Sequence, residues 1–313
     1  MARKAKRPSK IAHGLLLIDK PKGHSSFDVI RDLRRLTGVK KMGHTGTLDP
    51  MATGLLVICL GEGTKLVPYL TADDKSYEAE ITFGMSTDSY DAEGEMVAQD
   101  PWIKLDTLTQ EQVQDTLARF LGTHEQRPPA FSAIKVNGER LYAKARRGEE
   151  VEVPTRTVTF YELELLSFTP GQAEQGLLPK ASVRVKCSKG TYIRSLAFDL
   201  GQNMGLNTHL SALKRTQAGA FVLEHSQSLE NISGENLDQL LTPLVEALPQ
   251  ATHLALSQEA VLAVRQGKLI TAPSDLPPSE LSLCRATDPQ GRLVALLTFE
   301  KGKLKVLRGF NPE

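Results

Sequence analysis

Apolar residues recur along the first 250 residues at two kinds of spacing, one typical of strands and one typical of helices, and together these predict a mixture of strands and helices. A short apolar run from Gly14, closed by Lys20-Pro21 and Gly23, is typical of a buried strand that enters a turn. Other runs are continuously apolar or alternate between apolar and polar residues. The expected strands are 14–20, 55–60, 77–84, 156–168 and 181–187.

Apolar residues at helical spacing from Phe27 to Leu36, behind Ser25-Ser26 as starting residues, predict a helix whose other face carries three arginines. The other expected helices are 106–121, 195–206 and 235–247. Between these elements, residues 38–54 form a Gly/Thr-rich loop, and residues 86–100 are acidic and loop-like.

The pattern changes after about residue 250. Three short apolar runs are separated by the turns 288–291 and 301–302, which contain Gly, Pro and Asp. The expected strands are 281–287, 293–299 and 304–310. This pattern predicts a small all-β module after a larger mixed domain, and 313 residues are enough for two domains of about 150 residues each.

Composition narrows the class of protein. The 40% hydrophobic and 24% charged residues are close to a globular average and exclude disorder throughout. Cys59, Cys187 and Cys284 lie far apart, which argues against a disulfide scaffold and a Cys-rich zinc site. No run of about 18 apolar residues occurs, so no membrane span is expected, and the basic N-terminus lacks the apolar core of a signal peptide. The expected location is the cytoplasm.

Common catalytic motifs are missing from the sequence. The glycine spacing of residues 38–45 resembles a phosphate-binding loop, but His44 replaces the required lysine. There is no G-x-G-x-x-G, no H-x-x-x-H pair and no G-x-S-x-G. These observations argue against nucleotide hydrolysis, a dinucleotide cofactor and a catalytic metal.

One loop remains, G-H-T-G-T-L-D-P. Asp49 precedes Pro50, which favours an extended backbone. Gly43, Gly46 and Gly54 allow close approach of the backbone to a ligand. Asp49 alone is typical of a turn, so it is the whole string that points to chemistry.

Residues 43–54, G-H-T-G-T-L-D-P-M-A-T-G, closely resemble the catalytic signature of the TruB family of tRNA pseudouridine synthases. Four more blocks follow the family's order and extend the resemblance over most of residues 14–215. They are L-L-L-I-D-K-P-K-G at 15–23, D-K-S-Y-E-A at 74–79, P-P-A-F-S-A-I-K-V-N-G-E-R-L-Y at 128–142 and C-S-K-G-T-Y-I-R-S-L at 187–196. The C-terminal module resembles a PUA RNA-binding domain more weakly, through its short strands and its G-F-N-P ending.

The resemblance implies an α+β pseudouridine synthase fold, with a mixed, mostly antiparallel sheet and the active cleft across its middle. It divides the chain into a disordered basic arm (1–10), a catalytic domain (11–250) and a small all-β PUA-like domain (251–313). The family suggests a monomer with no obligatory protein partner and no cofactor.

The implied reaction detaches uracil from its ribose, turns it and rejoins it through carbon 5. The resemblance makes Asp49 the nucleophile, with attack on the ribose and attack on the uracil ring both open. Burial raises the pKa of a carboxyl group, and we expect the adjacent Arg194 to reverse that effect. An extruded base also needs a flat face against which to stack.

The family places Tyr77 against the target uracil, as a catalytic and substrate-binding residue. Tyr192 is the second base-contacting residue, and Leu213 occupies an apolar pocket position. His44 is expected to pack against the extruded nucleotides. Lys20 has two equal interpretations, contact with a phosphate or stabilisation of its own loop.

The layout resembles the bacterial branch, which implies that the partner is tRNA and that the target is uridine 55 in the T loop. A guide-RNA-dependent synthase subunit is one alternative, and a tRNA-binding or tRNA-folding protein with secondary catalysis is another. The net charge of +1 conceals clusters of one sign: five cations in 1–10, five in 31–41 and four in 184–194, against five acids in 88–100. We expect the cations to face RNA and the acids to be turned away.

Overall fold

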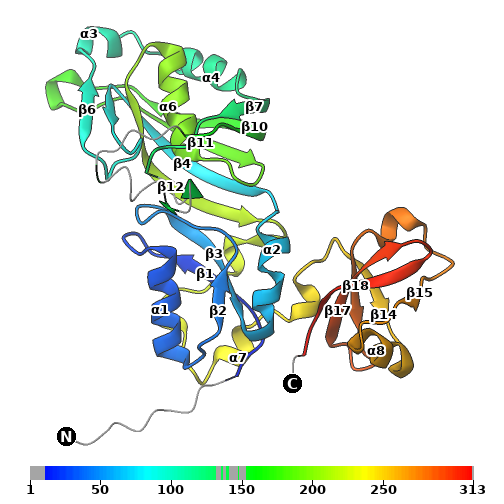
Figure 1. The fold of residues 1–313 in the computed structure, drawn as a ribbon. Coiled ribbons are helices and arrows are strands. Elements are labelled where there is room, and N and C mark those ends of the chain that lie inside the picture. Colours follow the sequence, from blue (N-terminus) through cyan, green and yellow to red (C-terminus); the bar gives the residue numbers. More distant parts are fainter. Residues whose placement is uncertain (1–10, 132–134, 137–138, 141–146, 148–152, 312–313) are drawn as a thin grey trace, which may run out of the picture.

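The computed structural model describes residues 11–131, 135–136, 139–140, 147 and 153–311. The predicted basic arm at 1–10 and much of the block at 128–142 lie outside these residues. Two separate large sheets are formed, one by the first 222 residues and one by the last 62 (Figure 1). The expected division into a large mixed part and a small C-terminal part therefore has a counterpart in the sheet topology.

The large sheet has nine strands, and its main path runs β1-β3-β12-β4-β11-β10-β7. These strands are β1 (Gly14–Lys20), β3 (Thr53–Leu60), β12 (Thr208–Ala218), β4 (Lys75–Phe83), β11 (Lys180–Cys187), β10 (Arg156–Thr169) and β7 (Gly122–Gln126), with β2 (Met42–His44) paired to β3 and β13 (Phe221–Val222) paired to β12. Every pair is antiparallel except β3 with β12. The prediction of a mixed, mostly antiparallel sheet is confirmed.

Helices α1 (Ser26–Thr37), α4 (Gln110–Ala118) and α6 (Ile193–Met204) contribute to one apolar core with this sheet. Helix α1 begins with a capping box between Ser25 and Asp28 and ends at Gly38 in the left-handed conformation. Local sequence therefore determines both ends of α1, and the start at Ser25 was predicted.

Several predicted elements differ in extent. The helix expected at 106–121 is only α4, which starts at the Thr109 cap, and a separate turn α3 (Trp102–Leu105) precedes it. The acidic stretch 86–100 contains a hairpin, β5 (Met85–Thr87) and β6 (Met96–Gln99). The helix expected at 235–247 is wrong. Only the short α7 (Leu237–Leu240) and a 3-10 turn (Leu244–Glu246) form, because Pro243 disfavours a helix before it and Thr242 pairs with Leu15.

The C-terminal sheet runs β14-β16-β17-β18-β15. Its strands are β14 (Thr252–Ala255), β16 (Cys284–Thr287), β17 (Leu293–Glu300), β18 (Lys303–Gly309) and β15 (Ile270–Thr271). The expectation of an all-β module is wrong, because α8 (Gln258–Arg265) packs its Val261 and Val264 into the core. Leu293, Leu296 and Phe310 belong to the same apolar cluster as β1 and β3, so the two parts are joined by hydrophobic contact.

Candidate active site

The loop between β2 and β3 is anchored on both sides of Asp49. The backbone N–H of Leu48 donates to the buried Ser26 hydroxyl (2.8 Å). The Pro50 carbonyl accepts from the Gly23 N–H (2.8 Å), and the Asp49 carbonyl accepts from the Ala52 N–H (3.1 Å). The β1–α1 turn and the first turn of α1 thus fix the position of the Asp49 backbone.

Lys20 belongs to this anchor. Its side chain is fully buried, and its ammonium donates to the carbonyls of Pro21 (3.0 Å), His24 (2.6 Å) and Pro50 (3.3 Å). Burial lowers the pKa of Lys20 to about 8. Of the two roles left open for Lys20, the structure favours loop stabilisation. Because its donors are directed at backbone carbonyls, contact of Lys20 with a phosphate of the substrate stays a prediction.

Asp49 and Arg194 meet at the middle of the large sheet. The Arg194 Nε lies 3.0 Å from Asp49 Oδ2, and the Arg194 side chain is 6% exposed whereas that of Asp49 is 35% exposed. Arg194 lies in the first turn of α6, and Asp49 lies in the anchored loop. The Asp49 carboxylate is therefore accessible to solvent, whereas the Arg194 guanidinium beside it is buried.

A second carboxylate, Asp91, completes the arrangement. Its Oδ2 lies 3.2 Å from Arg194 Nη1, and its side chain is 5% exposed. It comes from the loop of the β5–β6 hairpin, where Ser89 Oγ (2.7 Å) and the Glu93 N–H (3.0 Å) donate to its Oδ1. Arg194 also donates to the carbonyls of Ser89 (3.1 Å) and Phe131 (3.0 Å). Groups from three segments of the chain thus surround the fixed guanidinium fork.

The electrostatic balance at Asp49 differs from the prediction. Burial raises the pKa of the Asp49 carboxyl above its ordinary value, Arg194 opposes the rise and Asp91 adds to it. The expectation that Arg194 reverses the effect of burial is wrong, because its charge is shared between two carboxylates. Asp49 is consequently a better base than an exposed aspartate at the pH values where it is ionised.

A cavity of about 270 Å³ opens beside Asp49. Asp49, Arg194, Tyr77, Tyr192 and Leu213 all line it, so the fold brings together five of the seven predicted site residues. They come from the loop, α6, β4, the residue before α6, and β12. The two tyrosines and the leucine supply flat and apolar walls next to the ion pair.

Tyr192 is held by its backbone. Gln126 accepts from the Tyr192 N–H (2.8 Å) and donates to its carbonyl (3.0 Å), and Gln126 is itself buried. The Arg156 guanidinium lies 5.1 Å from the centre of the Tyr192 ring, at cation–π distance. Arg156 also lines the cavity, so a cation is placed at its edge.

Tyr77 is 8% exposed and pairs across the sheet with Arg215 of β12. Burial raises the pKa of the Tyr77 phenol, while the charge of Arg215 and a hydrogen bond from it oppose that rise. Lys75, two residues before Tyr77, is buried in the same wall and donates to the carbonyls of Thr71 (2.8 Å) and Asp73. Two buried cations thus flank the phenol.

His44 is not among the residues that line the cavity. It lies half-buried at the end of β2, opposite Ile58 of β3. Burial lowers the pKa of its imidazole, with Arg215 adding to the effect, so the neutral ring is favoured. The structure therefore keeps His44 in the loop but apart from the pocket formed by the other residues.

Sequence reasoning missed Asp91, Arg215, Lys75 and Arg156. No motif marked Asp91, which sits in an acidic stretch that we expected to turn away from RNA and that instead reaches the ion pair. Gly54 was interpreted as leaving space for a ligand. A Cβ at Gly54 would lie 2.3 Å from the Arg215 carbonyl, so the space is filled by the backbone of β12.

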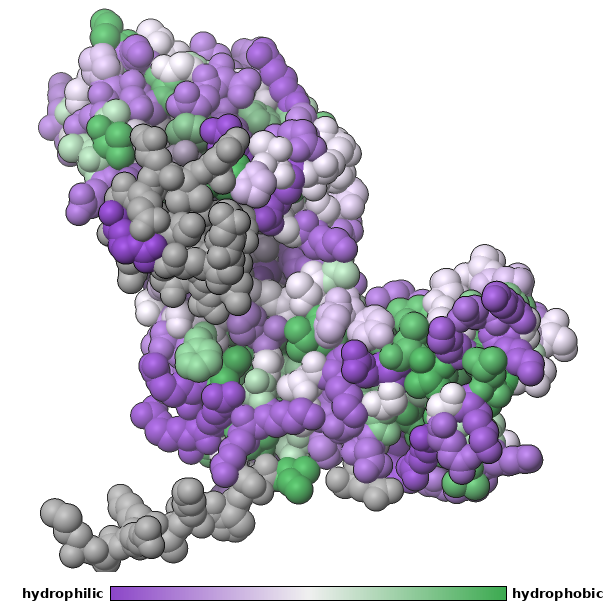
Figure 2. Space-filling view, in the orientation of Figure 1, coloured by the Kyte–Doolittle hydropathy of each residue, from purple (hydrophilic) through white to green (hydrophobic). Residues whose placement is uncertain are grey.

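The basic clusters are also partly neutralised. Arg184 pairs with Glu164 (2.5 Å) and Lys186 with Glu162 (3.2 Å), on exposed parts of β10 and β11. On α1, Arg31 and Arg35 pair with acids one turn earlier, while Arg34 donates to a backbone carbonyl. The surface over α1 remains strongly hydrophilic in Figure 2.

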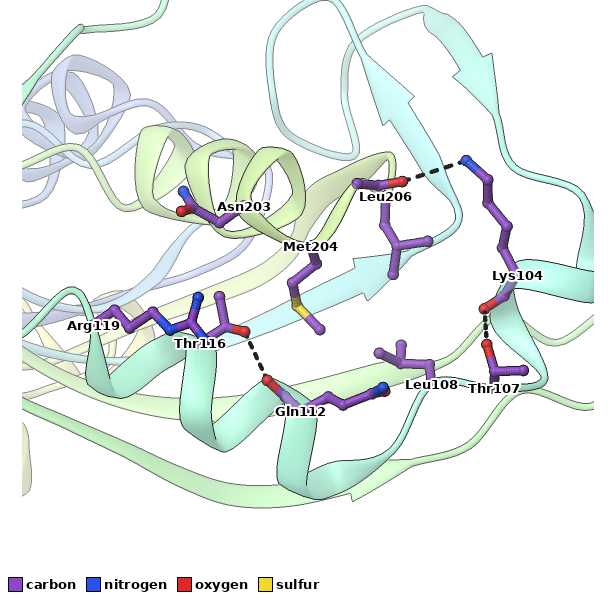
Figure 3. A pocket seen from close by; sticks show the side chains of 10 residues that line it. Lys104, Thr107, Leu108, Gln112, Thr116, Arg119, Asn203, Met204 and Leu206 are labelled. Atoms are coloured by element: carbon purple, nitrogen blue, oxygen red, sulfur yellow. Dashed lines mark hydrogen bonds between the residues drawn. The ribbon is translucent and has the colours of Figure 1, made fainter.

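A separate cavity of about 390 Å³ lies between α4 and the end of α6 (Figure 3). Met204 and Leu108 point into it, and Gln112 and Asn203 lie at its sides (Figure 3). It contains none of the predicted site residues and no carboxylate, so it offers no nucleophile for the implied chemistry.

Within the described residues, no group of three or more His, Cys, Asp or Glu side chains could hold a metal ion. No helix in the same part of the chain is long and apolar enough to cross a membrane.

Comparison with solved structures identifies the class of fold. The chain resembles the crystal structure of a Cbf5-Nop10-Gar1 complex with a TM-score of 0.68 and 25% identity, over 96% of this chain and 85% of that one. It also resembles the structure of an H/ACA RNP bound to a substrate RNA containing 2'-deoxyuridine, with a TM-score of 0.67 and 22% identity over 96% of this chain and 86% of that one. The fold is that of a pseudouridine synthase.

Sequence comparison identifies the family within that class. The sequence model of the TruB family pseudouridylate synthase, N-terminal domain, matches residues 34–193. The tRNA pseudouridine synthase B of Geobacillus thermodenitrificans is 42% identical over 84% of this chain and 87% of its own length. The enzyme of the same name from Francisella tularensis subsp. novicida is 40% identical over 93% of both chains. This chain belongs to the TruB family of pseudouridylate synthases.

Proposed function

We propose that this protein isomerises uridine 55 in the T loop of tRNA to pseudouridine. The single observation that carries the proposal is the half-accessible carboxylate of Asp49, ion-paired at 3.0 Å with a buried Arg194, at a cavity lined by two tyrosines. A reaction that breaks and remakes a bond to one base needs a nucleophile in such a slot, and needs no redox partner.

Asp49 is the nucleophile. Arg194 holds its carboxylate in one orientation and stabilises the ionised form against the effect of burial. Asp91 shares the guanidinium and so keeps Arg194 from neutralising Asp49 completely. Attack on the ribose and attack on the uracil ring both fit an accessible Oδ atom beside the cavity.

The target base enters the slot between the aromatic and apolar walls. Tyr77 and Tyr192 replace the stacking that an extruded base loses, which is worth about 1–3 kcal/mol per base. Leu213 excludes water from the apolar side, and Arg156 at the edge suits a neighbouring phosphate. His44 does not line the cavity, so the nucleotides that it contacts lie outside the cavity.

Residues 11–250 form the catalytic domain and residues 251–313 a PUA-like RNA-binding domain. The five-stranded sheet and its attachment to β1 and β3 through Leu293, Leu296 and Phe310 support this division. The basic arm at 1–10 adds non-specific attraction for phosphate, so affinity for tRNA falls as the salt concentration rises. The protein acts as a cytoplasmic monomer.

One alternative has an observation in its favour. Two of the similar structures are an H/ACA RNP and a Cbf5-Nop10-Gar1 complex, and a guide-dependent subunit would share their fold. The decisive experiment incubates the purified chain with an unmodified tRNA transcript and maps pseudouridine. Modification at position 55 without added RNA or protein supports stand-alone action, whereas activity only with a guide RNA supports the alternative.

A further inference from the structure

Arg215 is a buried cation without a carboxylate partner among the described residues. It is 2% exposed, and its guanidinium donates to two backbone carbonyls, Leu55 (Nε, 2.7 Å) and Gly46 (Nη2, 3.1 Å). Burying a cation without an opposite charge costs several kcal/mol even after relaxation. An arrangement this costly in the wall of an active site suggests a role in the chemistry.

The position of Arg215 connects the parts of the site. It lies two residues after Leu213 on β12 and opposite Tyr77 on β4, and all three side chains line the same cavity. Its acceptor on Gly46 belongs to the loop that carries Asp49. Its acceptor on Leu55 belongs to β3, the strand that follows that loop. One side chain thus bonds the loop and the neighbouring strand and lies across the strand pair from Tyr77.

The backbone of β3 packs closely against β12 at the position of Arg215. The parallel register sets Arg215 beside Gly54, which has a φ of +93° and no room for a Cβ next to the Arg215 carbonyl. The backbone of β12 is therefore in close contact with the backbone at Gly54, where the loop that carries Asp49 joins β3. The guanidinium cannot move away without losing its hydrogen bonds to the carbonyls of Gly46 and Leu55.

We propose that Arg215 is a positioning residue that acts through Tyr77. In this proposal the Arg215 guanidinium, which can only donate, forms a hydrogen bond to the oxygen of its cross-strand neighbour Tyr77, takes one lone pair of that oxygen and leaves the phenol's own proton free to point into the cavity. Tyr77 then presents a hydrogen-bond donor of fixed direction to the target base, in addition to its ring. This inference rests on the proposed function and adds a residue that the sequence motifs did not single out.

The test is a double-mutant cycle in single-turnover pseudouridine formation. Arg215→Gln should lower the rate constant roughly ten- to hundredfold, as expected for one charge-assisted hydrogen bond, while the Kd for tRNA stays within about twofold. In a Tyr77→Phe background the same change should cost less than about threefold. Losses that multiply in the double variant would show that Arg215 acts independently of Tyr77 and would overturn the proposal.

Arg215→Lys covers the case in which the Gln variant does not fold. Lysine keeps the charge but cannot serve the loop, β3 and the phenol with one planar fork. It should remain folded by circular dichroism and bind tRNA normally, yet lose rate by a similar factor. A Lys variant with the wild-type rate would overturn the proposal.

Arg119→Gln is the matched control, because Arg119 is an exposed arginine at the end of α4 that does not line the cavity beside Asp49, and the rate of this variant should be unchanged. Wild-type protein without any activity on tRNA would refute the proposed function itself. Active wild type with fully active Arg215 variants would refute only this inference.

Discussion

Asp91→Asn removes one negative charge from the centre of the site and keeps the shape of the side chain. The amide oxygen can still accept from Ser89 Oγ and the Glu93 N–H. The ion pair of 3.2 Å with Arg194, between side chains that are 5% and 6% exposed, is lost, because the amide NH2 group then faces a guanidinium that also can only donate. The full charge of Arg194 then acts on Asp49 alone.

The magnitude follows from this geometry. A hydrogen bond to a charged group contributes about 1.5–3 kcal/mol, which corresponds to a rate change of about 10- to 150-fold if the bond matters mainly in the transition state. Asp91 raises the pKa of the Asp49 carboxyl, so its neutralisation lowers that pKa. A carboxylate paired more tightly with Arg194 is a weaker nucleophile, although it stays ionised at lower pH.

The assay is single-turnover pseudouridine formation on a tRNA transcript across a range of pH. Because the proposed nucleophile must be ionised, activity should be lost as the pH falls through the pKa of Asp49. The Asp91→Asn variant should therefore have a lower plateau, an acid limb shifted toward lower pH and an unchanged Kd. Asp88→Asn, an exposed change in the same hairpin, is the control and should behave as wild type. An acid limb that shifts toward higher pH, or an unchanged plateau rate, would contradict this role of Asp91.

Three further predictions test other parts of the site. Asp49→Asn should melt at the same temperature as wild type or higher at pH 8. Because the raised pKa of Asp49 means that its charge disfavours the folded state above that pKa, the difference should shrink as the pH falls in scanning calorimetry. Tyr77→Phe should bind tRNA better than Tyr77→Ala in filter binding, and equal losses would contradict a stacking role. Gly54→Ala should prevent stable folding. Gly23→Ala, at a φ of +85° with nothing within 4 Å of the added Cβ, should lower the free energy of unfolding by only about 1–2 kcal/mol in urea denaturation. Equal effects of the two substitutions would contradict the packing role assigned to Gly54.

Much of the fold could be predicted where one residue type has one physical role. The apolar run of β1 and β3, the capping residues of α1 and the alternation of β11 each determine a local structure. Strand β12 was not predicted. It buries His209 and Arg215 at positions where a core strand is usually apolar, and two bulges break its alternation.

The candidate site likewise contains residues that could be predicted from the sequence and residues that could not. The motif-bearing residues Asp49, Tyr77, Tyr192, Arg194 and Leu213 were predicted from the resemblance and meet at one cavity. The partners of these residues could not be predicted, because they arrive through long-range contacts. Asp91 reaches Arg194 across about 100 residues of sequence, and no local pattern distinguishes a carboxylate in an acidic loop from one that is directed at a buried guanidinium.

We propose Asp49 as the nucleophile of uridine isomerisation in tRNA, and one measurement tests that role most directly. The direct measurement compares wild type with Asp49→Asn on an unmodified tRNA transcript labelled with tritium at carbon 5 of uridine, together with mapping of the modified position. Wild type should release tritium and place pseudouridine at position 55, and the variant should release none while retaining its tRNA affinity. Turnover by the variant above the level of contaminating enzyme would contradict the account.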